Sequence, residues 1–235
     1  MIVRRVKTTK LDIIKCAAKL FFEKGYSATS PRQICDILDL STGNITYYFP
    51  TKEHLLSVFV EMLCQYQWQM VLDETDTVTA VCLELAAMAV LCDENDVARD
   101  FYTSAYTSPM CLGLIRKSDT RRAKEVFGGC CPDWTDQQFE EAEVLASGIA
   151  YATLAKTEGC PPIEVRVAGA VQAVLGIYGF SKEERLAVTE RVMAADRRAL
   201  ALKMLTEFRA FIDHCNEKEL ERLIEAKQNQ IKKRQ

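Results

Sequence analysis

Small and polar residues gather in one short segment near the N-terminus. Between Ser41 and Tyr48, Ile45 is placed to face inward, and Pro50 ends the segment. The positions left facing outward are Thr42, Gly43, Asn44, Thr46 and Tyr47. Hydroxyl and amide groups of this kind form hydrogen bonds with base edges and phosphates. A helix that enters a DNA major groove, about 12 Å wide, needs an outer face without bulky apolar groups, and this segment predicts such a helix.

The flanking residues predict the helices that would position it. Apolar residues recur at helical spacing over residues 9–22, and Gly25 follows as a left-handed stop. Ser30 to Gln33 supplies an N-cap serine, a first-turn proline and the glutamine of a capping box. That second helix ends near Asp39, a residue type that tolerates the left-handed conformation. Another helix opens at residues 51–54. Two short helices joined by a tight turn describe a helix-turn-helix.

Charge divides the 235-residue chain unevenly. Residues 1–60 carry nine basic and five acidic side chains, a net charge of +4, whereas the whole chain carries −3. The other 175 residues therefore carry −7. A basic N-terminal part joined to an acidic body indicates that the first part meets a polyanion and the second has another task.

Taken together, the residues of the first part resemble a known family. The segment Ser41 to Leu56, STGNITYYFPTKEHLL, with Ala28 to Ser30 ahead of the second helix, is similar to the DNA-binding signature of the tetracycline-repressor (TetR) family of bacterial transcription regulators. The similarity covers roughly residues 9–60, and positions with different physical tasks agree at once. It departs from the usual pattern at Cys35, Asp39 and Tyr48, which affects fine geometry and leaves the motif intact.

The resemblance implies a division of tasks among these residues. Tyr47 and Lys52 would contact phosphates, as would Thr29 and Ser30 at a helix start, where free backbone amides favour an anion. The small residues of the third helix would face base edges. The full set of expected DNA-binding residues is Thr29, Ser30, Arg32, Ser41, Thr42, Gly43, Asn44, Thr46, Tyr47 and Lys52. A basic arm that reaches the minor groove or the backbone would consist of Arg4, Arg5, Lys7 and Lys10.

The remainder predicts helix after helix without strand alternation. The expected helices cover residues 76–92, 95–107, 108–127, 135–158, 162–178, a stretch after Ser181, and 197–215. The tail from residue 217 is compatible with a longer helix, a docked segment or a frayed end. We expect an all-α protein, with a three-helix helix-turn-helix domain over residues 1–52 and a larger helical effector-binding and dimerisation domain over residues 53–235.

One predicted body helix is apolar on nearly all sides. From Val167 to Tyr178 the only strongly polar residue is Gln172, so the helix must be covered on both faces. Its own domain covers one face, and a second subunit is the simplest cover for the other. The resemblance likewise implies a homodimer, here through residues 136–158 and 162–178. The alternative is that later helices of the same chain cover this one within a monomer.

The resemblance also implies a small-molecule effector held in the body. Candidate ligand-binding residues are its aromatic side chains, although the same residues suit an ordinary core. These candidates are Tyr66, Trp68, Phe101, Tyr102, Tyr106, Trp134 and Tyr151. The effector is not identifiable from the chain. In this family a regulator of this kind is more often a repressor than an activator.

The sequence contains few residues arranged for metal binding or catalysis. The ten cysteines mostly lie singly in apolar helical stretches, without metal-ligand spacing and with only two histidines, so we expect no metal, no cofactor and no enzyme. Cys130 and Cys131, in a Gly- and Pro-flanked loop, are the cysteines expected to be exposed. The alternative function is therefore a helical interaction protein or thiol-responsive sensor that has lost sequence-specific DNA binding. Without a signal segment or membrane span, we expect a cytoplasmic protein.

Overall fold

The structure is all-α, as the sequence predicts. The computed structural model describes residues 9–72, 76–220 and 222, apart from the side chains of residues 68–72, and in these residues it contains eleven helices and no strand. The N-terminal helices are α1 (Lys10–Lys24), α2 (Pro31–Leu38), α3 (Thr42–Tyr48) and α4 (Lys52–Leu72). The body helices are α5 (Thr77–Glu94), α6 (Asp96–Thr107), α7 (Pro109–Phe127), α8 (Asp136–Leu154), α9 (Ile163–Ile177), α10 (Lys182–Ala194) and α11 (Arg197–His214).

Local capping sets most of these helix starts. Thr9, Ser30, Thr135 and Ser181 each form a complete capping box, in which the cap side chain and the third helical residue satisfy each other's backbone amides. The capping box that the sequence predicts at Ser30 is thus confirmed. Asp39 ends α2 in the left-handed region, with φ 52° and ψ 47°, and so makes the tight turn into α3.

The body helices differ from expectation mainly at their ends. The helix expected to reach residue 158 ends at Leu154, because Ala155 adopts an extended backbone conformation with ψ 128°. The following residues, 155–162, form a connection that includes Gly159 at φ 72°. The last described residues, up to Leu220, begin another helical turn after α11, and residues 223–235 lie outside the described part of the chain.

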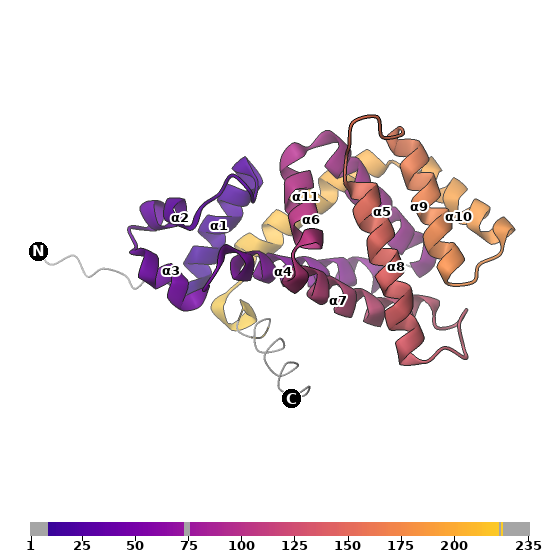
Figure 1. Cartoon of the computed structure of the whole chain (residues 1–235), viewed down its shortest axis with the longest axis horizontal. Helices are drawn as coiled ribbons and strands as arrows, with labels where there is room; N and C mark the ends of the chain where they lie inside the picture. Colours follow the sequence, from indigo (N-terminus) through magenta and orange to yellow (C-terminus); the bar gives the residue numbers. More distant parts are fainter. Residues whose placement is uncertain (1–8, 73–75, 221, 223–235) are drawn as a thin grey trace, which may run out of the picture.

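The helices form an elongated arrangement, with the helix-turn-helix at one end (Figure 1). Helices α1 to α3 occupy that end, and α8 to α10 occupy the other. Helix α4 leaves the first group and runs along the body beside α7, with which it packs. Helix α11 runs back behind the body toward α1, and it packs on α5, α4 and α1. The two ends are therefore connected by α4 and by the returning α11.

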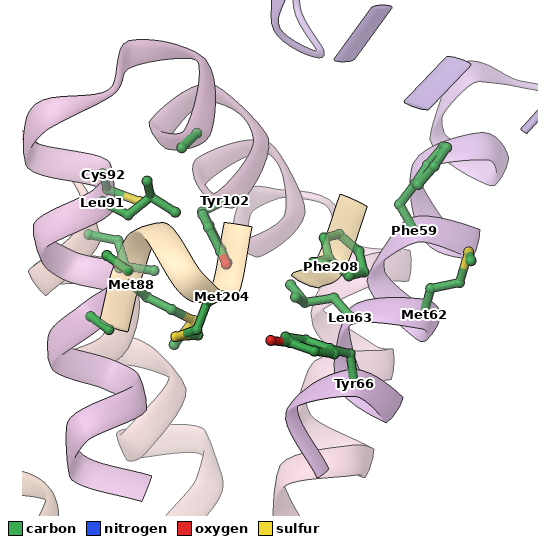
Figure 2. Packing of buried hydrophobic residues seen from close by; sticks show 14 of the residues in the cluster. Phe59, Met62, Leu63, Tyr66, Met88, Leu91, Cys92, Tyr102, Met204 and Phe208 are labelled. Carbon is green, nitrogen blue, oxygen red and sulfur yellow. The ribbon is translucent and has the colours of Figure 1, made fainter. Parts of the chain in front are cut away.

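One hydrophobic core extends through both parts of the chain. Figure 2 shows how α11 enters it, with Met204 directed toward α5 and Phe208 toward α4. Phe59 of α4 meets Phe21 of α1 edge to face, at 5.1 Å between ring centroids. The expected boundary between residues 52 and 53 falls at the first turn of α4, a helix that belongs to both parts, and it stays a prediction.

The cysteines behave as small apolar residues, with one correction. All ten are free thiols, and six of the seven expected in helical stretches are buried, while Cys16 is half-buried. Cys130 is exposed, but Cys131 is only 6% exposed, and its thiol donates to the Tyr178 carbonyl at 3.5 Å. The expectation that both thiols are exposed is wrong for Cys131, because the loop directs its amide to the Phe127 carbonyl and its thiol to the Tyr178 carbonyl.

Candidate DNA interface and body cavities

The outer face of α3, here called the α3 face, consists of Thr42, Gly43, Asn44, Thr46 and Tyr47. All five residues are exposed, and the Tyr47 side chain is 81% exposed. Ile45, on the opposite side of the helix, is 2% exposed and fixes α3 against the core. The structure thus brings together, on one solvent-facing surface, the four residues expected to face base edges and Tyr47, which is expected to contact a phosphate; these contacts stay predictions.

Short-range hydrogen bonds hold part of this face in shape. The Thr46 hydroxyl donates to the Thr42 and Gly43 carbonyls, each at 3.2 Å. The Ser41 hydroxyl donates to Asn44 Oδ1 at 3.3 Å, whereas the Asn44 amide nitrogen has no such bond within the described chain. The Tyr47 ring lies edge-on to Tyr48, at 5.0 Å between centroids. Donors and acceptors therefore remain available on a preorganised surface.

Packing within the protein does not require a glycine at position 43. A Cβ built at Gly43 would meet only the Ser41 hydroxyl oxygen, at 3.8 Å, which is ordinary van der Waals contact. A larger residue would therefore fit the protein itself, and it would also improve helix propensity by up to about 1 kcal/mol. The lack of a side chain leaves space for the close approach of another molecule.

The start of α2 places Ser30 and Arg32 on the surface and Thr29 inside, and the DNA contacts expected of Ser30 and Arg32 stay predictions. Ser30 and Arg32 are exposed, and Ser30 caps the helix. Thr29 is only 2% exposed; its hydroxyl donates to the Gly25 carbonyl at 2.8 Å, and its amide donates to the Tyr26 carbonyl at 3.1 Å. With both donors engaged inside the protein, Thr29 has no free group for the expected phosphate contact, so its task is to shape the α1–α2 turn.

Lys52, the first residue of α4, is held beside this turn. Its ammonium lies 4.1 Å from the centroid of the Tyr26 ring and donates to the Ser27 carbonyl at 3.3 Å. Partial burial lowers the pKa of Lys52, and the Asp100 carboxylate opposes that shift. The charge thus has a fixed position at the edge of the helix-turn-helix. Of the expected basic arm, Lys10 begins α1, while Arg4, Arg5 and Lys7 lie outside the described residues.

Polar contacts connect the helix-turn-helix directly to α6 and α7 of the body. The Asp100 carboxylate of α6 accepts from the Ser27 amide at 2.7 Å and from the Ser27 hydroxyl. The Ser108 hydroxyl, at the start of α7, donates to Glu53 in the first turn of α4. Any shift of α6 or α7 therefore acts on the loop and helix that flank the α3 face.

The aromatic residues proposed for ligand binding do not share one cavity. Tyr66, Phe101 and Tyr102 line an apolar cavity of about 40 Å³ between α1, α4, α5, α6 and α11. Trp134 packs on Phe139 and Tyr178, at 5.1 and 5.8 Å between centroids.

The other two aromatic candidates lie close together. Tyr151 is 38% exposed on α8, and its ring centroid lies 6.4 Å from that of Tyr106. Tyr106 lines a second cavity, described next. The Trp68 side chain lies outside the described residues. The ligand roles of all these residues stay predictions.

The second cavity is lined by charged groups that sequence reasoning missed. It has a volume of about 80 Å³ and lies among α5, α6, α7, α8 and the end of α9. We call it the carboxyl cavity, after Glu84, Asp119 and Glu143, which line it with Arg122. Its other walls include the aromatic rings of residues 106, 127 and 178 and aliphatic side chains of α5.

Arg122 forms ion pairs with two of the three carboxyl groups that line the cavity. Its guanidinium donates to Glu84 at 2.7 Å and pairs with Asp119 at 3.3 Å. Burial raises the pKa of Glu84 to about 7, against the lowering effect of Arg122. Burial also raises the pKa of Glu143, to about 9, and Asp119 adds to this rise, while Arg122 and Arg116 oppose it. The cavity therefore contains more carboxyl groups than its guanidinium neutralises.

A sequence signal for this cavity exists in retrospect. Glu84 interrupts the apolar run from Val78 to Leu91, and Glu143 stands between Ala142 and Val144. A charged residue inside an apolar stripe is expected to be paired or to line a site. Sequence alone does not reveal that these two stripes converge with Asp119 and Arg122 of α7.

Helices α8 and α9 expose apolar side chains on the surface away from the core. Val144 and Leu145 of α8 are 49% and 60% exposed, and Val165 of α9 is 59% exposed. Small residues on the same two helices are exposed as well, namely Gly148, Ala152, Gly169 and Ala173. The two helices pack on each other, so these residues form one surface, the α8–α9 face.

Two further features, metal-ion clusters and membrane-spanning helices, are absent from the described residues. Within them, no three histidine, cysteine or acidic side chains are grouped to hold a metal ion. None of the described helices has both the length and the hydropathy needed to cross a membrane.

Comparison with known proteins matches the N-terminal part of the chain. The family model described as bacterial regulatory proteins, tetR family, matches residues 13–58. A probable HTH-type transcriptional regulator, YttP of Bacillus subtilis, is 45% identical over 58 residues, which are 23% of this chain and 28% of YttP. The HTH-type transcriptional regulator QacR of Staphylococcus aureus is 39% identical over 62 residues, 26% of this chain and 31% of QacR. The matched segments thus span less than a third of each relative.

Two solved structures are similar at lower levels. A crystal structure of a gamma-butyrolactone receptor (ArpA like protein) is 18% identical, covers 77% of this chain and 94% of its own, and has a TM-score of 0.43. The crystal structure of Mycobacterium smegmatis AmtR is 19% identical, covers 80% and 96%, and has a TM-score of 0.37. The family match covers residues 13–58. This segment contains α2, α3 and most of the contacts that hold the α3 face in position. Over residues 13–58, the chain therefore carries a domain of the TetR family of bacterial regulatory proteins.

Proposed function

We infer that the chain is a transcription regulator that binds a near-palindromic DNA operator as a homodimer, represses there, and is released by a small-molecule effector. The observation that carries this proposal is the α3 face, where five small or polar residues are exposed together on a helix fixed by a buried isoleucine. A face of this shape fits a major groove and offers donors and acceptors to base edges.

Groups around the α3 face are suited to phosphate contacts. The exposed Tyr47 hydroxyl and the Lys52 ammonium lie at either end of the stretch that links α3 to α4. Ser30 and Arg32 add polar and positive groups at the start of α2. Phosphate contacts of this kind fix register and orientation, while the α3 residues specify sequence.

The α8–α9 face supports the homodimer. Its exposed valines and leucine would be buried by a second copy, and its glycines and alanines would let the two pairs of helices approach closely. Two-fold symmetry then presents two α3 helices, and a spacing of about 34 to 36 Å matches one turn of DNA. The expected operator is therefore nearly palindromic.

The contacts between body and helix-turn-helix support effector control. Asp100 holds the α1–α2 loop, and Ser108 holds the start of α4. An effector that binds more tightly to a conformation with the α3 helices at the wrong spacing would lower operator affinity by that difference, typically about 1 to 3 kcal/mol.

The test is to select genomic fragments with the purified full-length chain and then titrate the enriched fragment at two salt concentrations. We expect one near-palindromic site, bound by two copies and far more tightly than unrelated DNA. Weak, strongly salt-dependent binding without enrichment would contradict the proposal and would favour a helical protein without sequence readout.

A parallel measurement tests the dimer. Leu145→Glu places a charge on the α8–α9 face, and sedimentation should show a monomer with weakened operator binding. Leu202→Glu is the matched control, because Leu202 is similarly exposed, at 63%, on α11. A dimer that persists in Leu145→Glu would place the interface elsewhere.

A further inference from the structure

The carboxyl cavity contains one acid without a partner. Glu143 is only 4% exposed, yet within residues 9–72, 76–220 and 222 its carboxyl group forms no hydrogen bond and no ion pair. The other acids differ, since Glu84 and Asp119 share the Arg122 guanidinium. A buried carboxyl group without a partner costs free energy, and a protein retains one mainly where something else satisfies it.

We propose that the carboxyl cavity binds a lipophilic organic cation, with the positive nitrogen beside Glu143 and the apolar body against the aromatic walls. This inference rests on the proposed function, since it names the class of effector that the body would take.

The charges that face the cavity favour a cation over an anion. They come from Glu84 on α5, Asp119 and Arg122 on α7, and Glu143 on α8. Arg122 is already paired with two carboxylates, so it contributes little attraction for an anionic ligand. Arg116 is the other nearby cation, and its Nε donates to the Ser147 hydroxyl at 2.9 Å rather than to Glu143.

The walls of the carboxyl cavity are suited to the apolar part of a lipophilic cation. Tyr106 of α6 and Tyr178 at the end of α9 present aromatic rings, and Tyr178 is stacked on Phe127 at 4.0 Å between centroids. Aromatic faces attract cations, and the attraction grows when water is excluded. Leu85 and Met88 of α5 complete an apolar wall. At about 80 Å³ the space suits a compact organic group, since a water molecule needs roughly 10 to 15 Å³ by this kind of measure.

The protonation of Glu143 gives the proposal a distinctive signature. Burial raises the pKa of Glu143 to about 9, so the empty site holds a neutral acid at pH 7. A bound cation favours the carboxylate, so binding at pH 7 should release about one proton for each site. Affinity for a fixed positive charge should then rise with pH up to the pKa of the free site.

The test is calorimetry of the full-length chain with probes that match in shape and differ in charge. The probes are 2-phenylethylammonium, the neutral 2-phenylethanol and the anionic phenylacetate. We expect the ammonium ion to bind at least about tenfold more tightly than the alcohol, and phenylacetate to bind more weakly than either. Benzyltrimethylammonium, which carries no proton to lose, measures proton release through the dependence of binding enthalpy on the buffer.

Two variants on the same helix locate the site. Glu143→Gln keeps the shape of a neutral acid and should fold, but it should lose the preference for the ammonium ion and release no proton. Glu140→Gln makes the same change at an exposed position of α8 and should behave as the wild type. Equal binding of ammonium and alcohol, no binding of either cation, or an unchanged preference in Glu143→Gln would each overturn the proposal.

Operator binding, measured without any probe, separates this proposal from the proposed function. A chain that binds its enriched operator but shows no Glu143-dependent cation binding would refute the inference alone. Cation binding that depends on Glu143 in a chain that enriches no operator would refute the regulator and leave the cation site standing.

Discussion

The α3 face and the carboxyl cavity are both polar, but they satisfy their polar groups in opposite ways. On the α3 face the groups point to water, and the hydrogen bonds among them join residues three or four positions apart. In the carboxyl cavity the main ion pair joins Glu84 to Arg122, 38 residues away, and both side chains are largely buried. Changes on the α3 face should therefore alter binding at little cost in stability, whereas changes in the cavity should alter stability itself.

The largest expected effect comes from the cavity. Arg122→Met removes the partner of buried Glu84 and should lower the free energy of unfolding by about 3 to 5 kcal/mol. Urea unfolding measures this loss. The control is Arg198→Met, which breaks an exposed pair with Glu94 and should leave the free energy of unfolding nearly unchanged. Equal losses in the two variants would remove the distinction between the two regions.

The next effect belongs to the α3 face. Gly43→Glu should leave the free energy of unfolding unchanged or slightly higher, because a new side chain meets only open space and Glu has the better helix propensity. Operator affinity should fall about a hundredfold or more, close to 3 kcal/mol, because a bulky negative group meets the DNA. Gly113→Glu, also exposed and without neighbours within 4 Å, should retain affinity. A tight operator complex with Gly43→Glu would show that α3 does not approach the DNA.

The third prediction concerns the pH dependence of the free energy of unfolding, which Glu143 of the carboxyl cavity should affect. The pKa of Glu143 is raised from 4.5 to about 9, so the unfolded chain loses this proton first and stability falls as pH rises between these values. Relative to the wild type, Glu143→Gln should therefore become more stable by about 2 kcal/mol between pH 6 and pH 8. Thermal or urea unfolding across that range measures the difference. Parallel pH profiles for the two proteins would mean that Glu143 is already ionised in the folded state.

The smallest effect concerns a single phosphate contact. Lys52→Ala should weaken binding to all DNA sequences by about tenfold and reduce the salt slope by about 0.9, as expected for one lost contact. Titrations of specific and unrelated DNA at several salt concentrations measure both quantities. Lys182→Ala is the matched control, since Lys182 is likewise the first residue of a helix but lies at the far end of the body. A change confined to the operator sequence would instead assign Lys52 to base readout.

Prediction from sequence succeeded where neighbours along the chain decide the structure. The capping box at Ser30 follows from a side chain that bonds to an amide three residues away, and the left-handed Asp39 follows from an intrinsic backbone preference. The exposure of the α3 face follows from the same logic, because one inward residue on a short helix determines which side faces out.

Prediction from sequence failed where an irregular turn, or packing between distant segments, determines the surroundings of a side chain. Thr29 suits a phosphate contact by type and position, yet the turn after α1 folds its hydroxyl onto Gly25. Cys131 adjoins an exposed cysteine, yet it is buried and its thiol donates to the carbonyl of Tyr178, 47 residues away. The aromatic residues proposed for one pocket are separated because they lie on helices that face different cavities.

The sequence by itself therefore determined the all-helical class, the helix-turn-helix and the residues on its outer face, since these depend on periodicity, caps and turn chemistry within a few residues. Only the tertiary structure decided that Glu84, Asp119, Arg122 and Glu143 meet in one buried cavity, and that Lys52 is held between Tyr26 and the Asp100 contact. The physical reason is that the energy of a buried charge depends on which distant groups surround it, and packing alone brings those groups together.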